Sequence, residues 1–204
     1  MSVTPSGADA GAEVRTIRRV CVFCGASHGS RPEYTTAAFE LGRGLAERGM
    51  TLIYGGGRAG LMGAVADAAL GAGGSVVGVI TRLLEGRELG HTGVTELHVV
   101  ETMHERKMKM ATLADAFIAM PGGLGTLDEL FEILAWAQLG IHRKPVGLLS
   151  TAGFYDSLMT FIDHADAEGF VRMNHRTELV VEKSVPALMS RLMTTIPGGA
   201  RFPG

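Results

Sequence analysis

From about Ile17 onward, short apolar runs rich in β-branched residues alternate with longer segments of helical periodicity. The short runs predict strands at 17–24, 51–54, 75–80, 94–100, 116–120, 145–149 and 178–181. The longer segments predict helices at 32–48, 58–72, 102–114, 125–139, 153–168 and 184–194. This alternation is typical of a Rossmann-like α/β fold, a doubly wound parallel sheet with helices on both faces. Ligands of such sheets bind beyond the carboxyl ends of the strands, so the loops after the strands should carry the chemistry.

The chain of 204 residues is long enough for one α/β domain with a sizeable core. No internal repeat, proline-rich linker or break in composition divides it, so we expect residues 16–196 to form a single domain. Residues 1–15 and 197–204 are rich in small, polar, glycine or proline residues and should be loose tails. We find no signal-peptide pattern and no apolar run of membrane-spanning length, and therefore expect a cytoplasmic protein with no membrane partner.

Charge and cysteine content exclude several classes of partner. A net charge of −2 argues against a nucleic-acid surface, which needs clustered lysine and arginine, but allows a ligand with a single phosphate. The two cysteines, Cys21 and Cys24, lie three residues apart in a predicted strand and should therefore point to opposite faces. We expect buried thiols in a reducing compartment rather than a redox or metal pair.

Histidines give no metal site. His104 precedes a glutamate, as in a zinc peptidase motif, but no second histidine stands four positions later. The others occur singly and are expected to be surface or loop residues, at positions 28, 91, 98, 142, 164 and 175. We therefore expect no metal.

The first of two glycine-rich loops follows the predicted strand 51–54 and reads Gly55-Gly56-Gly57-Arg58-Ala59-Gly60-Leu61-Met62-Gly63. Glycines permit a tight turn and close approach by a phosphate, and the helix start beyond them offers unpaired N–H groups. A dinucleotide site also needs an acidic residue at the end of the next strand, and 75–80 runs into Thr81-Arg82 without one. Glycines that serve only a strand–helix turn remain the alternative.

The second glycine-rich loop follows the predicted strand 116–120 and reads Pro121-Gly122-Gly123-Leu124-Gly125-Thr126-Leu127-Asp128-Glu129. Its backbone again leads into a helix start, where Thr126 can cap the helix or donate its hydroxyl to a phosphate. It is not a P-loop, because no Gly-Lys-Ser/Thr follows. Together the two loops predict a ligand with one phosphate.

The predicted helix 125–139 has apolar residues on two sides. One stripe consists of Leu127, Leu130, Phe131 and Leu134, and the other contains Glu129, Ile133 and Trp136. We expect the first stripe to cover the sheet and the second to contact another subunit. Glu129 would then lie in the first turn beside an interface, ionised by the helix dipole unless burial opposes it. A first-turn acid that only complements the dipole is the alternative.

The predicted helix 102–114 places two cations beside its apolar stripe. Arg106 and Lys107 border the stripe that Met103 and Met110 mark, and both could reach a ligand pocket. Alternatively, both side chains extend past the edge of the sheet into solvent. Glu105 and Lys109 should form an exposed i,i+4 pair.

Three of these segments together resemble the LONELY GUY (LOG) family of cytokinin riboside 5′-monophosphate phosphoribohydrolases. The family's PGGxGTxxE matches 121–129 at every fixed position, its GGGxxGLMG matches 55–63, and its MHERK matches 103–107. Segments 21–27 and 136–142 are also similar, so the resemblance extends from about Ile17 to Met193. Three motifs in register are far more specific than any one of them.

The resemblance implies an enzyme whose catalytic pair is Arg106 and Glu129. It also implies a homodimer, no cofactor, and a nucleoside 5′-monophosphate as the small-molecule partner. Glu88 corresponds to an acid 18 residues before the arginine, in a loop that departs from the plant pattern. The implied substrate contacts are Ser27, Gly56, Gly57, Glu88, Met103, Lys107, Gly122, Gly123, Leu124, Gly125, Thr126, Leu127 and Asp128.

On this basis we expect hydrolysis of the N-glycosidic bond of N6-substituted adenosine 5′-monophosphates to a free base and ribose 5-phosphate. Glu129 would stabilise an oxocarbenium-like ribose and activate water, while Arg106 would hold the phosphate or orient the ribose and Glu129. Hydrolysis of unsubstituted AMP is one alternative, and a non-catalytic nucleotide or cofactor carrier is another. Family members have also been described as lysine decarboxylases, but no lysine here stands in an evident pyridoxal phosphate motif.

Overall fold

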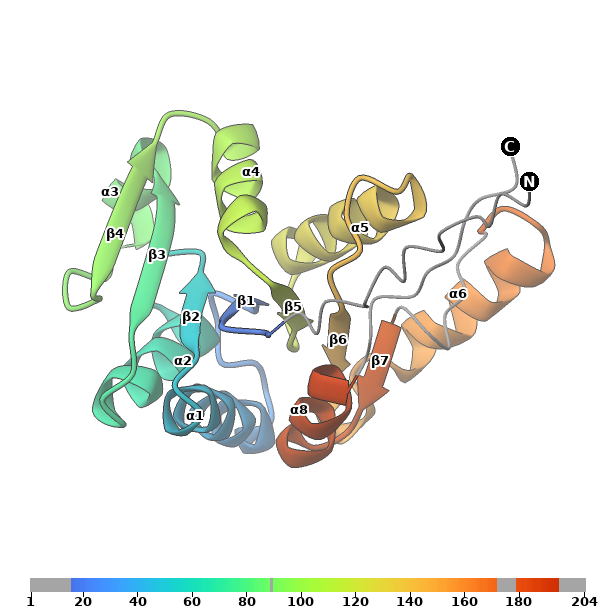
Figure 1. Ribbon diagram of the computed structural model, residues 1–204, viewed down its shortest axis with the longest axis horizontal. Helices are drawn as coiled ribbons and strands as arrows, with labels where there is room; N and C mark the ends of the chain where they lie inside the picture. The colour runs from blue at the N-terminus through green and yellow to red at the C-terminus, as the bar shows by residue number, and fades with distance from the viewer. Residues whose placement is uncertain (1–15, 89, 172–178, 195–204) are drawn as a thin grey trace, which may run out of the picture.

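Seven parallel strands form one sheet in the order β4-β3-β2-β1-β5-β6-β7 (Figure 1). This computed structural model describes residues 16–88, 90–171 and 179–194, so the predicted tails and His175 lie outside the described residues. The strands are β1 (Arg19–Phe23), β2 (Thr51–Tyr54), β3 (Val76–Thr81), β4 (Glu96–Val100), β5 (Ala116–Ala119), β6 (Val146–Leu149) and β7 (Leu179–Glu182). The doubly wound α/β class is confirmed.

The helices fall close to the predicted segments, with two exceptions. They are α1 (Pro32–Glu47), α2 (Gly60–Gly71), α3 (Arg82–Glu88), α4 (Met103–Leu113), α5 (Leu124–Gln138), α6 (Asp156–Ala167) and α8 (Val185–Thr194). The sequence pattern did not predict α3. The predicted start at 153 was wrong, because positive φ angles at Ala152 and Gly153 separate a short 3-10 turn (Thr151–Gly153) from α6. No helix in the described ranges is long and apolar enough to cross a lipid bilayer.

Two hydrophobic cores lie on the two faces of the sheet. One contains residues of α1, α2 and α8, and the other contains residues of α4, α5 and α6. Figure 1 shows α1, α2 and α8 gathered on one side of the strands, with α4 and α5 on the other. Cys24 belongs to the first core and Cys21 to the second, and both are free thiols. The prediction that the two sulfurs point to opposite faces is confirmed.

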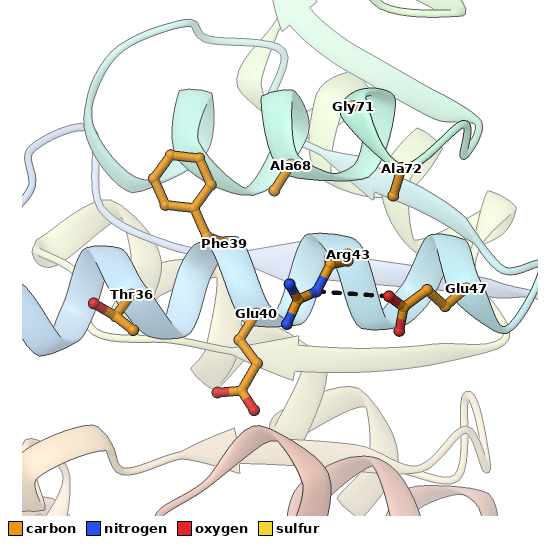
Figure 2. A pocket seen from close by; sticks show the side chains of 8 residues that line it. All are labelled: Thr36, Phe39, Glu40, Arg43, Glu47, Ala68, Gly71 and Ala72. Atoms are coloured by element: carbon orange, nitrogen blue, oxygen red, sulfur yellow. Dashed lines mark ion pairs between the residues drawn. The ribbon is translucent and has the colours of Figure 1, made fainter.

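A hollow of about 760 Å³ lies between the outer faces of α1 and α2 (Figure 2). Ala68 and Gly71 form its wall on α2, and the side chains of Phe39, Arg43 and Glu47 border it on α1. Arg43 and Glu47 are 3.6 Å apart and mostly exposed, so their attraction is weak. Apart from Phe39 in the middle of α1, these residues lie toward the carboxyl ends of their helices, at the amino edge of the parallel sheet and opposite the edge where ligands bind. We therefore place the active site elsewhere.

Candidate active site

The order of the strands changes direction at β1, which lies between β2 and β5. The loops after β1 and β5 therefore diverge at this point, and a backbone hydrogen bond from Gly25 N to Pro121 O (3.1 Å) holds their bases together. A hollow of about 190 Å³ lies here, lined by Ser27, His28, Gly29, Tyr34, Leu61, Pro121, Gly122, Gly123 and Phe154. Such a topological switch point is the expected ligand site of an open parallel sheet.

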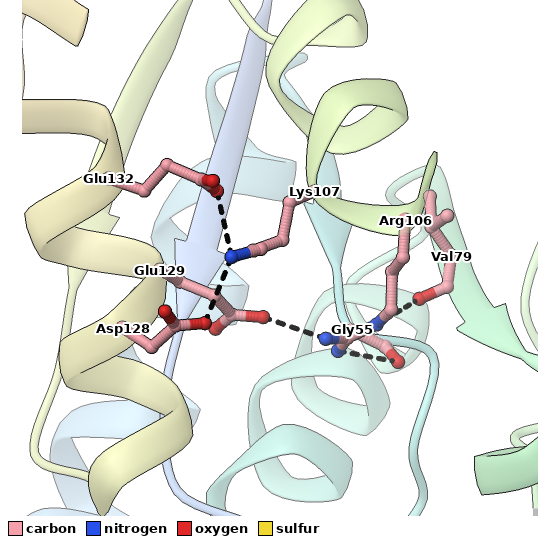
Figure 3. Close-up of polar contacts among 7 residues, drawn as sticks. All are labelled: Gly55, Val79, Arg106, Lys107, Asp128, Glu129 and Glu132. Carbon is pink, nitrogen blue, oxygen red and sulfur yellow. Dashed lines mark hydrogen bonds and ion pairs between the residues drawn. The ribbon is translucent and has the colours of Figure 1, made fainter. Parts of the chain in front are cut away.

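Arg106 lies one turn into α4 and is 6% exposed. Its guanidinium donates to Val79 O from Nε (2.9 Å), to Glu129 Oε1 from Nη1 (2.8 Å) and to Gly55 O from Nη2 (3.2 Å) (Figure 3). A Cβ atom on Gly55 would collide with Nη2, so close approach of the arginine requires glycine there. Acceptors on β3, on α5 and directly after β2 thus fix one side chain.

Glu129 is the partner of Arg106 on α5 and is 8% exposed. Burial raises the pKa of Glu129 above its usual value, although the charge of Arg106 and its hydrogen bond oppose the shift. Within the described part of the chain, Oε1 alone has a hydrogen-bond partner, so Oε2 is available to water or a sugar hydroxyl. The contact brings the two predicted catalytic residues together, while their catalytic roles remain a prediction.

Lys107 links α4 to α5. Its Nζ lies 3.1 Å from Asp128 Oδ2 and 3.1 Å from Glu132 Oε2 (Figure 3). Burial alone would lower the pKa of Lys107, but the hydrogen bonds to both carboxylates outweigh it and raise the pKa. Two of the predicted substrate contacts, Lys107 and Asp128, therefore form an ion pair with each other and hold the two helices in register.

The predicted pair between Glu105 and Lys109 was wrong. Glu105 Oε2 accepts the N–H groups of Glu101 (3.0 Å) and Thr102 (3.4 Å), and the Thr102 hydroxyl accepts the N–H of Glu105 (3.1 Å). This capping box begins α4 and so sets the position of Arg106. The spacing of threonine and glutamate was a signal that could have predicted it.

The two glycine-rich loops differ in what they offer to a phosphate. The N–H groups of Leu61 and Met62 in α2 donate to Gly25 O at 3.0 and 3.3 Å, so the expectation of unpaired groups there was wrong. In contrast, no acceptor in the described structure takes the N–H groups at 124–126, the first turn of α5. Unpaired N–H groups at a helix start favour an anion, so the amino end of α5 is the better candidate of the two loops for a phosphate site.

The two predicted stripes of α5 are one continuous buried face. Leu130, Ile133 and Leu134 belong to the same core and Glu129 is buried as well, whereas Phe131 is 42% exposed. The expectation of separate burial partners for opposite stripes was therefore wrong. A helical wheel shows which residues are apolar, but α4 and the sheet together cover an arc wider than either stripe.

The remaining predicted contacts are spread around this edge. Ser27, Gly122 and Gly123 line the hollow at the switch point. In the residues that follow, Leu124 and Gly125 are exposed, Thr126 is buried and Leu127 is half-buried. Met103 is 44% exposed at the start of α4. Gly56 and Gly57 are buried behind Gly55. The side chain of Glu88 lies outside the described residues.

Ser27 is also the centre of a Gly-x-Ser-x-Gly spacing over 25–29. A nucleophile elbow needs a histidine base within hydrogen-bond reach of the serine. The neighbouring His28 instead contacts Thr35 Oγ1 through Nδ1 at 3.1 Å, and no described hydrogen bond joins a histidine to Ser27. The geometry does not support a serine hydrolase.

Two positioning contacts could not be predicted from the sequence. The Tyr155 hydroxyl donates to Met120 O (2.6 Å), just before the second glycine-rich loop. His91 is buried and bonded to Asp67, so the expectation of a surface or loop histidine was wrong in its burial. Neither residue belongs to a motif or a periodic pattern. Both contacts join segments far apart in the chain, so no local pattern could predict them.

The fold and this edge of the sheet define a Rossmann-like protein with a helix start suited to a phosphate and a buried Arg–Glu pair beside it. Solved structures agree with the fold. The molybdenum cofactor carrier protein of Chlamydomonas reinhardtii superposes with a TM-score of 0.66, at 22% identity over 86% of this chain and 96% of that one. A second structure, TM1055, has a TM-score of 0.65 at 23% identity over 86% of this chain and 98% of its own.

Sequence comparisons identify the family. Residues 62–192 match the family model described as "Possible lysine decarboxylase". The probable cytokinin riboside 5′-monophosphate phosphoribohydrolase LOGL9 of Oryza sativa subsp. japonica is 52% identical over 88% of this chain and 79% of its own. Cytokinin riboside 5′-monophosphate phosphoribohydrolase LOG2 of Arabidopsis thaliana is 49% identical over 88% of this chain and 84% of its own. The chain therefore belongs to the LOG family.

Proposed function

We propose that this protein hydrolyses the N-glycosidic bond of N6-substituted adenosine 5′-monophosphates and releases a cytokinin-type base and ribose 5-phosphate. Relatives about half identical over most of the chain carry this activity in their names. The observation that carries the proposal is the buried contact of Arg106 with Glu129 at 2.8 Å. Glu129 lies on α5, and the unpaired N–H groups in the first turn of this helix suit the 5′-phosphate.

In the proposed reaction a water oxygen bonds to C1′ of the ribose while the bond from C1′ to the base breaks. The ribose gains positive charge as the base leaves, and a carboxylate beside it stabilises that charge. Glu129 takes a proton from the attacking water, and the departing base gains a proton from solvent. Arg106 holds the Glu129 carboxylate toward the sugar through Oε1 and leaves Oε2 for the water.

A partner subunit and a cytoplasmic location complete the proposal. The support for a homodimer is a set of exposed apolar side chains on α5 and just beyond its end, namely Phe131, Leu139 and Ile141. The support for a reducing compartment is that Cys21 and Cys24 are buried free thiols.

Incubation with AMP or isopentenyladenosine 5′-monophosphate, followed by chromatography of the products, tests the activity. We expect release of the free base from the prenylated nucleotide. Release from isopentenyladenosine, which lacks the phosphate, should be slower by about a hundredfold, since remote binding energy contributes to turnover. Faster release from AMP would favour the AMP nucleosidase alternative. Binding of both nucleotides without any released base would reject the hydrolase and favour a carrier.

A further inference from the structure

His91 is a buried histidine to which the function proposed above gives no role. It is 5% exposed and lies in the connection between α3 and β4. Its backbone N–H donates to Gly56 O at 3.0 Å, and the preceding Gly90 pairs with Gly57 in an isolated antiparallel bridge. The segment 90–91 therefore fastens onto the loop that runs from Gly55 to Gly57.

The ring of His91 is fixed through both of its nitrogens. The N–H of Gly93 donates to Nδ1 at 3.2 Å, so Nδ1 is the acceptor and the neutral ring carries its proton on Nε2. Nε2 lies 2.8 Å from Oδ1 of Asp67 and donates to it. Asp67 lies in the middle of α2, the helix that begins directly after the same glycine-rich loop. The carboxylate of Asp67, on a rigid helix, thus orients the ring of His91, and the backbone of His91 holds the loop.

The loop held in this way carries a carbonyl that Arg106 needs. Gly55 O accepts Nη2 of Arg106 at 3.2 Å, and the next residue, Gly56, has a φ of 76°, a conformation that glycine alone adopts freely. A run of three glycines has no side chains that would keep this carbonyl in place. Backbone contacts to neighbouring segments must do so, and His91 supplies one of them.

We propose that His91, oriented by Asp67, is a positioning residue that holds the Gly55–Gly57 loop so that Arg106 presents Glu129 to the ribose. This inference rests on the proposed function of Arg106 and Glu129. It assigns a role in catalysis to two residues that are not among the proposed catalytic or substrate-binding residues. Its effect falls on the rate of the chemical step, because a small misplacement of a reacting group lowers turnover steeply.

Two substitutions test this clamp, by which we mean the contacts of His91 with Asp67 and with the Gly55–Gly57 loop. Asp67→Ala removes the acceptor of Nε2, and His91→Phe removes both contacts of the ring. We expect kcat to fall about tenfold in each, part of the ~100-fold that a 1 Å misplacement costs, with KM within about threefold of wild type. Asp67→Asn keeps an oxygen acceptor for Nε2 and should recover most of the lost kcat. In the double variant the two losses should not add, because both substitutions break the same contact.

His98→Ala is the matched control. His98 Nε2 lies 2.7 Å from Glu96 Oε1, so this is another histidine–carboxylate pair in the same part of the chain, on β4. In the described contacts it does not bond to the glycine-rich loop, and we expect its kcat to remain within twofold of wild type. A second readout is the exchange rate of the Arg106 Nη hydrogens by NMR, because Nη2 donates to Gly55 O, with the signal assigned from Arg106→Lys. Exchange should be faster in Asp67→Ala and unchanged in His98→Ala.

Each outcome decides between the clamp and the proposed function. Wild-type kcat in both Asp67→Ala and His91→Phe, with Glu129→Gln inactive, would overturn the clamp and leave the proposed function standing. An active Glu129→Gln would reject the proposed function whatever the clamp variants do. If His91→Phe does not fold, Asp67→Ala decides alone, because the Asp67 side chain is 56% exposed and its loss leaves the core intact. An equal loss of kcat in His98→Ala would also overturn the clamp.

Discussion

At the scale of single residues, the guanidinium of Arg106 donates hydrogen bonds to three acceptors: one directly after β2, one on β3 and one on α5. A planar fork of N–H donors can satisfy three acceptors in fixed directions, and a lysine ammonium cannot reproduce that geometry. The carboxylate of Glu129 is therefore held from one side before any ligand arrives. Such preorganisation is the usual source of electrostatic catalysis, because no reorganisation remains to be done during the reaction.

Glu129→Gln and Arg106→Lys should each lower turnover of the nucleotide by about a hundredfold or more, since general-base assistance contributes roughly 10²–10⁴ in rate. Steady-state assays of released base measure the loss. Glu182→Gln is the matched control, because Glu182 also pairs with an arginine, Arg191, at 2.7 Å but lies on β7. Turnover within threefold of wild type in either test variant would remove its residue from the mechanism.

The pH dependence of kcat/KM follows from the raised pKa of Glu129. The mechanism uses the ionised carboxylate, so activity should be lost as the pH falls through that pKa, above the value of about 4.3 typical of glutamate. A profile of kcat/KM against pH should show this acid limb in the wild type and no such limb in the residual activity of Glu129→Gln. An acid limb below the ordinary glutamate pKa would contradict the assignment.

The raised pKa of Glu129 also affects the stability of the fold, which depends on pH in the opposite direction from activity. The folded state binds the Glu129 proton more tightly than the unfolded chain, so protonation adds to the free energy of unfolding. This contribution is full below the unfolded-chain pKa and disappears as the pH rises through the raised folded pKa. The ionised form that catalysis uses is therefore the less stable one.

At the scale of elements, glycines at the ends of different elements have different roles. Gly55 directly follows β2, and a Cβ atom on it would strike Arg106, whereas a Cβ atom on Gly71, the last residue of α2, meets nothing within 4 Å. Gly55→Ala should therefore lower kcat at least tenfold by displacing the arginine, comparable to other small misplacements. Gly71→Ala should leave kcat unchanged and raise the free energy of unfolding by about 0.5–1 kcal/mol. Urea unfolding and kcat of the two variants check both halves, and equal effects on kcat would contradict this interpretation.

The elements also show what the sequence could predict. Helix α1 was expected at 32–48 and runs from Pro32 to Glu47, because proline favours a first turn and Gly49, with a φ of 66°, follows its end. Helix α3 was missed because it has seven residues and no apolar stripe, with Leu83 66% exposed. The pairing of Arg106 with Glu129 joins residues 23 apart, which no local pattern encodes. Only the family motifs brought the two together before the fold was known.

At the scale of the whole molecule, the two faces of the sheet differ in what they leave exposed. Leu139 and Ile141, at the end of α5, are 72% and 65% exposed, and Phe131 on the same helix is 42% exposed. Helices α1 and α8 lie on the opposite side of the sheet (Figure 1), where Phe39 of α1 is 48% exposed and Met193 of α8 is 51% exposed. Several exposed apolar side chains on one element are characteristic of a protein interface, whereas single ones on separate helices are ordinary on a surface. We therefore predict that two chains associate through the end of α5.

Size-exclusion chromatography with light scattering tests this prediction directly. The wild type should have twice the 21.5 kDa mass of one chain, and Ile141→Glu should have the mass of one chain, because a buried unpaired charge in each copy opposes association. Phe39→Glu adds the same charge to the other face and should leave the larger mass unchanged. Dissociation by Phe39→Glu alone would place the interface on α1, and a wild type of 21.5 kDa would reject the dimer. Because Glu129 lies on the helix that ends in this patch, loss of turnover together with loss of the larger mass in Ile141→Glu would connect association to the active site.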